Sequence, residues 1–259
     1  MRGRLHWIDM RLLPRGWRDL LRQIVLFLAA FTLYGLVRGL VGDGNVYKPF
    51  GDAMRIIDVE RALHIFAEPS VQAWTENKHW LMDAADWIYL NGHFLLTFLA
   101  LLYIYLRRNA SFYFVRNMFL ISMAIALVGY WLYPTAPPRL LPEWGFTDSV
   151  SQFLIGSTGH LDNGPGKAFL NFYAAVPSMH VCFAVMIGWS MTRLVSWRPG
   201  RIAWSLYPLL VTFVVVATAN HYFTDVFLGA LTAGASMLLA HRLFARARPD
   251  IWAFGRASA

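Results

Sequence analysis

The chain reads IAWSLYPLLVTFVVVATANHYFTDVFLGALTAGASMLLAHRLF from residue 202 to residue 244. Its two apolar runs, 202–219 and 222–244, each approach the roughly 20 residues that a helix needs to cross a bilayer core of about 30 Å. Asn220 and His221 stand at their junction, with Asp225 four residues further on. The stretch therefore predicts two consecutive membrane-spanning helices with ionisable side chains where they meet.

Six runs of this kind predict an all-α fold, a polytopic membrane protein built as a six-transmembrane-helix bundle. Apolar residues make up 57% of the 259 residues and charged residues only 15%, against about 25% charged in soluble domains. We expect a single membrane domain over residues 1–259. The spans are expected at about 20–41, 84–106, 114–133, 175–195, 202–219 and 222–244.

Basic residues are distributed unevenly between the two sets of loops. Sixteen of the 23 Lys and Arg residues, with only three Asp, lie in four segments: 1–22, 107–116, 193–201 and 242–256. The positive-inside rule then predicts that both tails, 1–19 and 245–259, are cytoplasmic. The net charge of +8 thus follows from topology in the bilayer, and we expect no nucleic-acid partner. A short chain with few long loops suits a bacterial inner (plasma) membrane.

Two segments on the opposite, extracytoplasmic side are too long to be simple turns. In the first, 42–83, apolar residues recur at helical spacing and charged residues occupy the other face, which predicts an amphipathic helix on the outer surface. The apolar residues are Ile56, Val59, Leu63 and Phe66, and the charged residues are Arg55, Asp58, Glu60 and Arg61. The second segment, 134–174, is rich in Pro and Gly, and loops of that length in compact domains tend to be functional.

Three polar segments occur where predicted spans meet that same side. They are YPTAPPR at 133–139, AAVPSMH at 174–180 and ANHYFTD at 219–225. Because all three lie at one depth, we expect the intervening loops to bring them together as an extracytoplasmic site.

Helix ends in these segments favour an anion. Pro177 is tolerated in the first turn of a helix, which would place His180 near its N-terminus, and Asn220 is a plausible N-cap for the last span. Free N–H groups and partial positive charge at helix N-termini bind phosphate. Arg139 adds a planar guanidinium suited to phosphate oxygens.

The two histidines could then perform chemistry on that phosphate. His221 and Asp225 are four residues apart, so the carboxylate can accept a hydrogen bond from one ring nitrogen and leave the other free. An imidazole held in this way is a competent nucleophile toward phosphorus. His180 could donate a proton to the departing oxygen.

The three segments together resemble the motifs of the type 2 phosphatidic acid phosphatase superfamily, and more closely its inositol phosphorylceramide synthase branch. The resemblance implies metal-independent transfer of a phosphoryl or phospho-headgroup unit through a phosphohistidine, with no cofactor. By motif alignment it implies His221 as nucleophile, Asp225 as its orienting carboxylate and His180 as leaving-group acid. It also implies that Ser178 and Arg139 belong to the phosphate pocket.

The chain departs from the phosphatase pattern at four positions. Where that pattern has Lys, Pro, Ser and Arg, this sequence has Leu132, Leu140, Val214 and Val215. Two cations of the usual phosphate cradle are therefore missing. This favours a phosphodiester donor or phosphotransferase chemistry over hydrolysis of a phosphomonoester, with Lys167 a candidate substitute.

The expected partners are the bilayer, a phospholipid or lipid-phosphate substrate, and a polyol acceptor such as inositol. His93 and Tyr89, on the outer half of the second predicted span, are candidates for contact with the acceptor or headgroup. The sequence leaves the oligomeric state open.

Two other functions are compatible with these residues. A phospholipid transporter or flippase could bind a headgroup with the same side chains and perform no chemistry. A metal hydrolase could use His180, His221 and Asp225 as a ligand triad.

Overall fold

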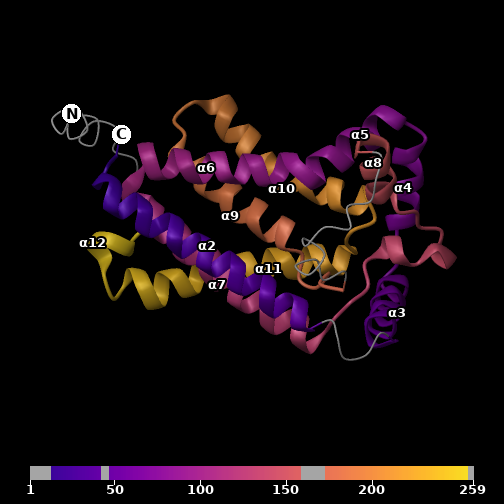
Figure 1. Cartoon of the computed structure of the whole chain (residues 1–259). Helices are drawn as coiled ribbons and strands as arrows, with labels where there is room; N and C mark the ends of the chain where they lie inside the picture. The colour runs from indigo at the N-terminus through magenta and orange to yellow at the C-terminus, as the bar shows by residue number, and fades with distance from the viewer. Residues whose placement is uncertain (1–12, 42–46, 159–172, 256–259) are drawn as a thin grey trace.

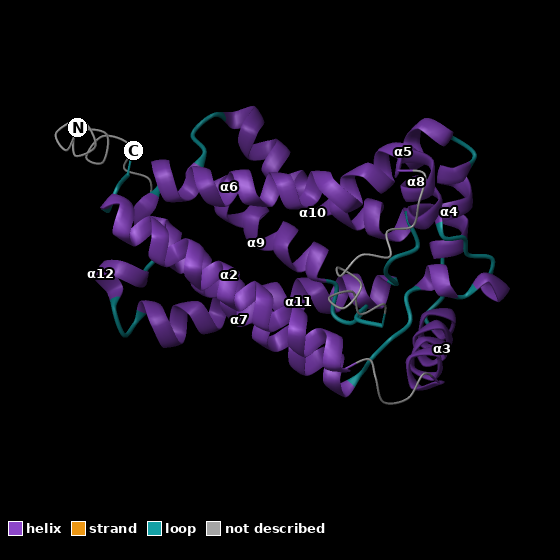
Figure 2. Ribbon diagram, viewed as in Figure 1, coloured by secondary structure: helices purple, strands orange, loops and turns teal. Residues whose placement is uncertain are grey.

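The computed structural model describes residues 13–41, 47–158 and 173–255, and in these ranges the chain is helical without a β-sheet. Long helices run side by side along the molecule, short helices gather at one end, and α12 (Pro249–Trp252) lies at the other (Figures 1 and 2). The long helices are α2 (Gly16–Val41), α6 (His93–Arg107), α7 (Asn109–Leu132), α9 (Met179–Leu194), α10 (Arg198–Ala217) and α11 (Phe223–Leu239). The short ones are α4 (Glu68–Glu76), α5 (His79–Trp87) and α8 (Ser149–Thr158), and α3 (Tyr47–Ala62), which is as long as α9, lies at the same end (Figure 1).

Five helical segments in the described ranges are long and apolar enough to cross a membrane. They are Gly16–Val37, His79–Arg107, Asn109–Leu132, Arg198–Ala217 and Phe223–Ala245. The second begins with α5, passes through the π-helix η1 (Ile88–Gly92) and continues as α6. The last extends α11 through a second π-helix, η5 (Ala240–Ala245).

The remaining predicted span, 175–195, is shorter than expected. Its helix is α9, which has 16 residues and is therefore about 24 Å long at 1.5 Å per residue, less than a bilayer core of roughly 30 Å. Ser178 is the N-cap, so Pro177 precedes the helix and does not lie in its first turn as expected. The described residues therefore contain five candidate spans of full length, and the expected sixth corresponds to α9, a shorter central helix.

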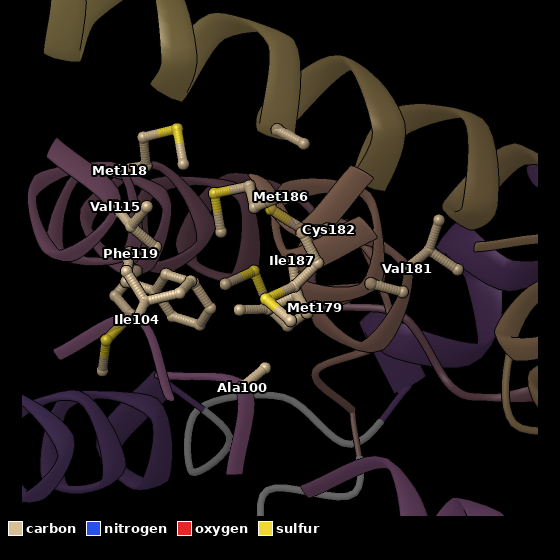
Figure 3. Close-up of a cluster of buried hydrophobic side chains, with 14 of the residues drawn as sticks. Ala100, Ile104, Val115, Met118, Phe119, Met179, Val181, Cys182, Met186 and Ile187 are labelled. Carbon is tan, nitrogen blue, oxygen red and sulfur yellow. The ribbon is translucent and has the colours of Figure 1, made fainter. Parts of the chain in front are cut away.

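The main hydrophobic core surrounds α9. Figure 3 shows Met179, Cys182, Met186 and Ile187 of α9 beside side chains of α6 and α7, and Ile187 is fully buried. The helix also packs along α10 and α11. Because neighbours surround α9, the position of its first residues is fixed by packing on several sides.

The predicted surface helix is α3, but its faces differ from the prediction. Ile56 is buried as expected, whereas Val59 is 52% exposed and Leu63, beyond the helix end, is 63% exposed. Glu60, expected on the polar face, is fully buried. The buried face is rotated because the Glu60 carboxylate binds a backbone N–H group at the start of α11.

A close contact joins α9 to α11. The Ser178 N–H group donates to the carbonyl oxygen of Asp225 at 3.1 Å. A Cβ atom on Gly229 would lie only 2.4 Å from the carbonyl oxygen of Ser178, closer than packed atoms allow. Glycine at 229 therefore lets the start of α9 lie directly on α11.

This contact predicts a position-specific effect of alanine. Gly229→Ala forces the two backbones apart and should cost about 1–3 kcal/mol of stability, which lowers the Tm measured in detergent. Gly234→Ala, on the same helix with no atom within 4 Å of the added Cβ, is the matched control and should leave Tm unchanged or slightly raised. Equal Tm values for the two variants would contradict the contact.

Candidate functional site

The three polar segments meet at the end of the bundle that carries the short helices. Three backbone hydrogen bonds join them. Thr135 N–H donates at 2.8 Å to the carbonyl oxygen of Tyr173, the residue directly before the second segment, Arg139 N–H donates to Ala219 O at 2.8 Å, and Ser178 N–H donates to Asp225 O at 3.1 Å. Thr135 and Ala174 also form an isolated parallel β-bridge. The backbone itself therefore fixes the relative positions of the side chains that these segments carry.

His221 is held by Asp225 across the start of α11. The His221 Nδ1 and Asp225 Oδ2 atoms are 3.3 Å apart, and Asp225 is fully buried. Asp225 Oδ2 also accepts from the Tyr222 N–H group at 3.0 Å. Nδ1 is thus the nitrogen that faces the carboxylate, and Nε2 is the nitrogen left for chemistry in the cavity.

The N-cap of α11 is Tyr222, so the predicted cap at Asn220 is wrong. Asn220 lies before the helix, where its Nδ2 donates to the Thr218 carbonyl and hydroxyl oxygens at 3.1 and 2.8 Å. The turn places Ala219 in the left-handed region with φ of 49°. Non-glycine residues rarely adopt that conformation, and strained backbone of this kind is concentrated at functional sites.

Val215 contributes to the same turn through its backbone. Its carbonyl oxygen accepts from the N–H groups of both Asn220 and His221, at 3.0 and 3.1 Å. The Val215 side chain is fully buried. The phosphatase pattern has an Arg where this chain has Val215. Val215 therefore stabilises the turn through its backbone and brings no positive charge to the site.

His180 is the second residue of α9 and lies beside His221. Their ring centroids are 6.0 Å apart. The Tyr89 ring stacks on the His180 ring, with centroids 4.5 Å apart and an interplanar angle of 24°. The N-cap Ser178 accepts from the Val181 N–H group at 3.5 Å, so the serine predicted to bind phosphate is used to begin the helix.

Arg139 approaches the histidines from the 3₁₀-helix η2 (Pro138–Leu140). Its Nη1 donates to Asn220 Oδ1, and its Nε lies 3.8 Å from a carboxylate oxygen of Asp148. These contacts orient the guanidinium without enclosing it, since its side chain stays 15% exposed.

The two candidates for acceptor contact, Tyr89 and His93, extend this cluster along α6. Tyr89 lies in the π-helix η1, and His93 begins α6. His93 is 1% exposed, its ring centroid is 5.1 Å from that of His180, and its Nδ1 lies 2.8 Å from the Tyr207 hydroxyl of α10. Sequence patterns do not reveal the π-helix or the pairing with Tyr207.

One cavity of about 390 Å³ is lined by Tyr89 and His180, whereas His93 packs against His180 and is not among the described residues that line the cavity. Its polar lining comes from Arg139, His180, Asn220 and His221, and Arg139 is the only Lys or Arg among the described residues that line it. Its apolar walls include aromatic side chains of α2 and α6, at Phe31, Tyr34 and Phe94. The cavity therefore combines one cation and two imidazoles with a largely apolar surround.

The first turn of α11 does not offer the free N–H groups that were expected for phosphate. The Tyr222, Phe223 and Thr224 N–H groups donate to three different carboxylates, at 3.0, 2.9 and 2.6 Å, those of Asp225, Glu68 and Glu60 respectively. Glu68, on α4, and Glu60, on α3, were not predicted to lie near the site. Burial, and after it the Glu60 side chain, raises the pKa of Glu68 to about 8.

Lys167 lies outside the described residues. Within the described residues, no group of three or more His, Cys, Asp or Glu side chains is arranged to hold a metal ion. His180, His221 and Asp225 are close together. Asp225 Oδ2, however, faces His221 Nδ1 and accepts from the Tyr222 N–H group, so this oxygen is already bound to protein groups.

Comparison with known families assigns most of the chain. A family model described as the PAP2 superfamily matches residues 54–239. No curated protein and no solved structure shows a significant match.

Proposed function

The chain belongs to the PAP2 superfamily, which indicates a phosphatase-type membrane enzyme, and on that premise we propose that it transfers a phospho-headgroup or phosphoryl group from a lipid through a phosphohistidine on His221. The observation that carries the proposal is the pairing of His221 Nδ1 with the buried Asp225 carboxylate. This pairing fixes the tautomer in which Nε2 carries the lone pair.

The two histidines divide the reaction between them. Nε2 of His221 forms a bond to phosphorus while the bond from phosphorus to the leaving oxygen breaks, and His180 gives that oxygen a proton. A hydroxyl group then attacks phosphorus, the phosphorus–nitrogen bond breaks, and His180 takes the proton of the attacking hydroxyl. The two ring centroids are 6.0 Å apart, which is close enough for both imidazoles to contact one phosphate group.

The charge of the cavity favours a phosphodiester donor. Arg139 is the single cation in its described lining, and Asn220 orients it. A phosphodiester carries one negative charge, whereas a phosphomonoester carries close to two at neutral pH. One guanidinium therefore matches the donor of a headgroup transferase better than a phosphomonoester.

The surround of the cavity supports an amphiphilic donor and a hydroxyl acceptor. Aromatic side chains of α2 and α6 offer apolar contact to acyl chains. His93 lies beside His180 and, among the described residues, has no hydrogen-bond partner for Nε2. A polyol such as inositol could supply that partner. We place the site at the extracytoplasmic face of a bacterial inner membrane, on the distribution of basic residues in the loops.

The nucleophile is tested with protein purified in detergent and assayed in chelator against phosphomonoester and phosphodiester lipids, with and without inositol. His221→Ala should lower kcat by roughly 10³-fold or more. His241→Ala, which changes an exposed histidine outside the cavity, is the control and should match the wild type. Wild-type turnover by His221→Ala with every lipid would overturn the assignment.

Asp225→Asn tests the orienting role separately. The amide can present an N–H group to Nδ1, which selects the wrong tautomer and should lower kcat by about 10²–10⁴-fold, with little change in the KM for the lipid. A fall in lipid affinity at constant kcat would show that Asp225 serves binding and does not set the tautomer.

The role of His93 in binding the acceptor is tested by the ratio of transfer to inositol over hydrolysis by water. His93→Phe should raise the KM for inositol and lower the ratio of transfer to hydrolysis, while release of the first product stays close to wild type. Tyr207→Phe, which removes only the hydroxyl that faces His93 Nδ1, should give a smaller shift in the same direction. An unchanged ratio in both variants would exclude His93 and Tyr207 from contact with the acceptor.

A further inference from the structure

Two glutamates from different surface helices meet beneath the first turn of α11. Glu60 belongs to α3, Glu68 belongs to α4, and both are fully buried. Glu68 Oε1 accepts from the Phe223 N–H group at 2.9 Å, and Glu60 Oε1 accepts from the Thr224 N–H group at 2.6 Å. Neither carboxylate forms an ion pair with a Lys, Arg or His among the described residues.

The second oxygen of each carboxylate has no partner of its own. Oε2 of Glu60 and Oε2 of Glu68 are both buried, and neither finds a donor among the described residues. The two carboxylates bind the N–H groups of adjacent residues, Phe223 and Thr224, and their side chains interact. One proton held between them gives both orphan oxygens a partner, whereas two bare carboxylates would repel each other in a medium of low dielectric constant.

We propose that Glu60 and Glu68 share one proton and together clamp the first turn of α11, which positions the imidazole of His221. The proposal rests on the nucleophilic role proposed above for His221. Phe223 and Thr224, whose N–H groups the pair binds, follow His221 by two and three residues. A pair with one net negative charge also complements the positive end of the helix dipole without placing a second charge there.

The clamp links the surface helices to the reacting group. Asp225 holds His221 Nδ1 directly, while Glu60 and Glu68 hold the backbone on which both residues stand. A displacement of α3 or α4 would move that backbone, and a misplacement of about 1 Å can cost roughly 10²-fold in rate. Glu60 and Glu68 are thus positioning residues that do not touch the substrate.

The shared proton predicts a specific dependence of stability on pH. The groups around the pair are Tyr222 and Asp225 at the start of α11 and, near Tyr222, Glu143 of the 3₁₀-helix η3 (Pro142–Trp144). The pKa of Glu68 is raised from 4.5 to about 8, so the folded protein binds more protons than the unfolded chain between these values. The contribution of Glu68 to the free energy of unfolding is therefore fully present below about pH 4.5 and is lost as the pH rises through about 8.

Glu68→Gln tests the proton on the resting protein. The amide keeps an acceptor for the Phe223 N–H group and a donor toward Glu60 but cannot ionise. The fall in Tm from pH 4.5 to 8 should be shallower than in wild type, and the infrared carbonyl band of a protonated carboxylic acid should be lost. Glu143→Gln removes an exposed carboxylate nearby and should change neither readout. A Tm slope and band equal to wild type in Glu68→Gln would overturn the shared proton.

Glu68→Leu tests the positioning. It leaves the Phe223 N–H group without an acceptor and removes the carboxylate that shares the proton with Glu60, so kcat should fall roughly 10²-fold at a nearly constant KM for the lipid, whereas Glu68→Gln should keep most of the turnover. Wild-type kcat in a folded Glu68→Leu protein would overturn the positioning role. If Glu68→Leu does not fold, loss of turnover in Glu68→Gln would overturn it instead.

If the wild-type protein itself shows no turnover, only the proposed function fails. The positioning of His221 is then tested by the NMR chemical shift of its ring, which Glu68→Leu should change and Glu68→Gln should preserve.

Discussion

The hydrogen bond from the Ser178 N–H group to the Asp225 carbonyl oxygen fixes the start of α9 on the first turn of α11. His180 follows Ser178 by two residues, and His221 precedes Asp225 by four, so the separation of the two rings is set by backbone contacts. Gly229 permits this approach because any Cβ there would strike the Ser178 carbonyl oxygen. Together with the hydrogen bonds from the Thr135 and Arg139 N–H groups, the bond from Ser178 to Asp225 joins segments that are far apart in the chain into one rigid unit.

The N-terminal ends of α9 and α11 have different roles because, among the described residues, carboxylates occupy only one of them. Three carboxylates occupy successive N–H groups of the first turn of α11, which commits that helix end to holding His221. An anion in the cavity therefore depends on Arg139 and on the positive end of the α9 dipole. This division explains how buried acids can lie close to a site proposed for phosphate, because their oxygens accept from backbone N–H groups of α11.

The sequence predicts the parts of this structure that depend on composition and local spacing. The apolar runs, the convergence of the three polar segments and the contact between His221 and Asp225 all follow from such patterns. The misses involve contacts between distant residues. Glu60 reads as a solvent-facing charge because its partners, Glu68 and Thr224, are 8 and 164 residues away. Asn220 reads as an N-cap, but the tertiary turn with Ala219 at φ of 49° moves the start of α11 to Phe223.

The short length of α9 has a consequence for how a lipid could reach the site. A helix of 16 residues is about 24 Å long, roughly one turn less than the thickness of the bilayer core. If its C-terminal end lies at one interface, its N-terminal end, which carries His180, is recessed by about that turn from the other. Longer neighbours, such as α7 with 24 residues, extend past this level and wall the cavity with apolar side chains. A phosphate attached to acyl chains can enter such a recess while its chains stay in hydrocarbon, whereas a free, fully hydrated phosphate ester would lose its hydration there without compensating apolar contact.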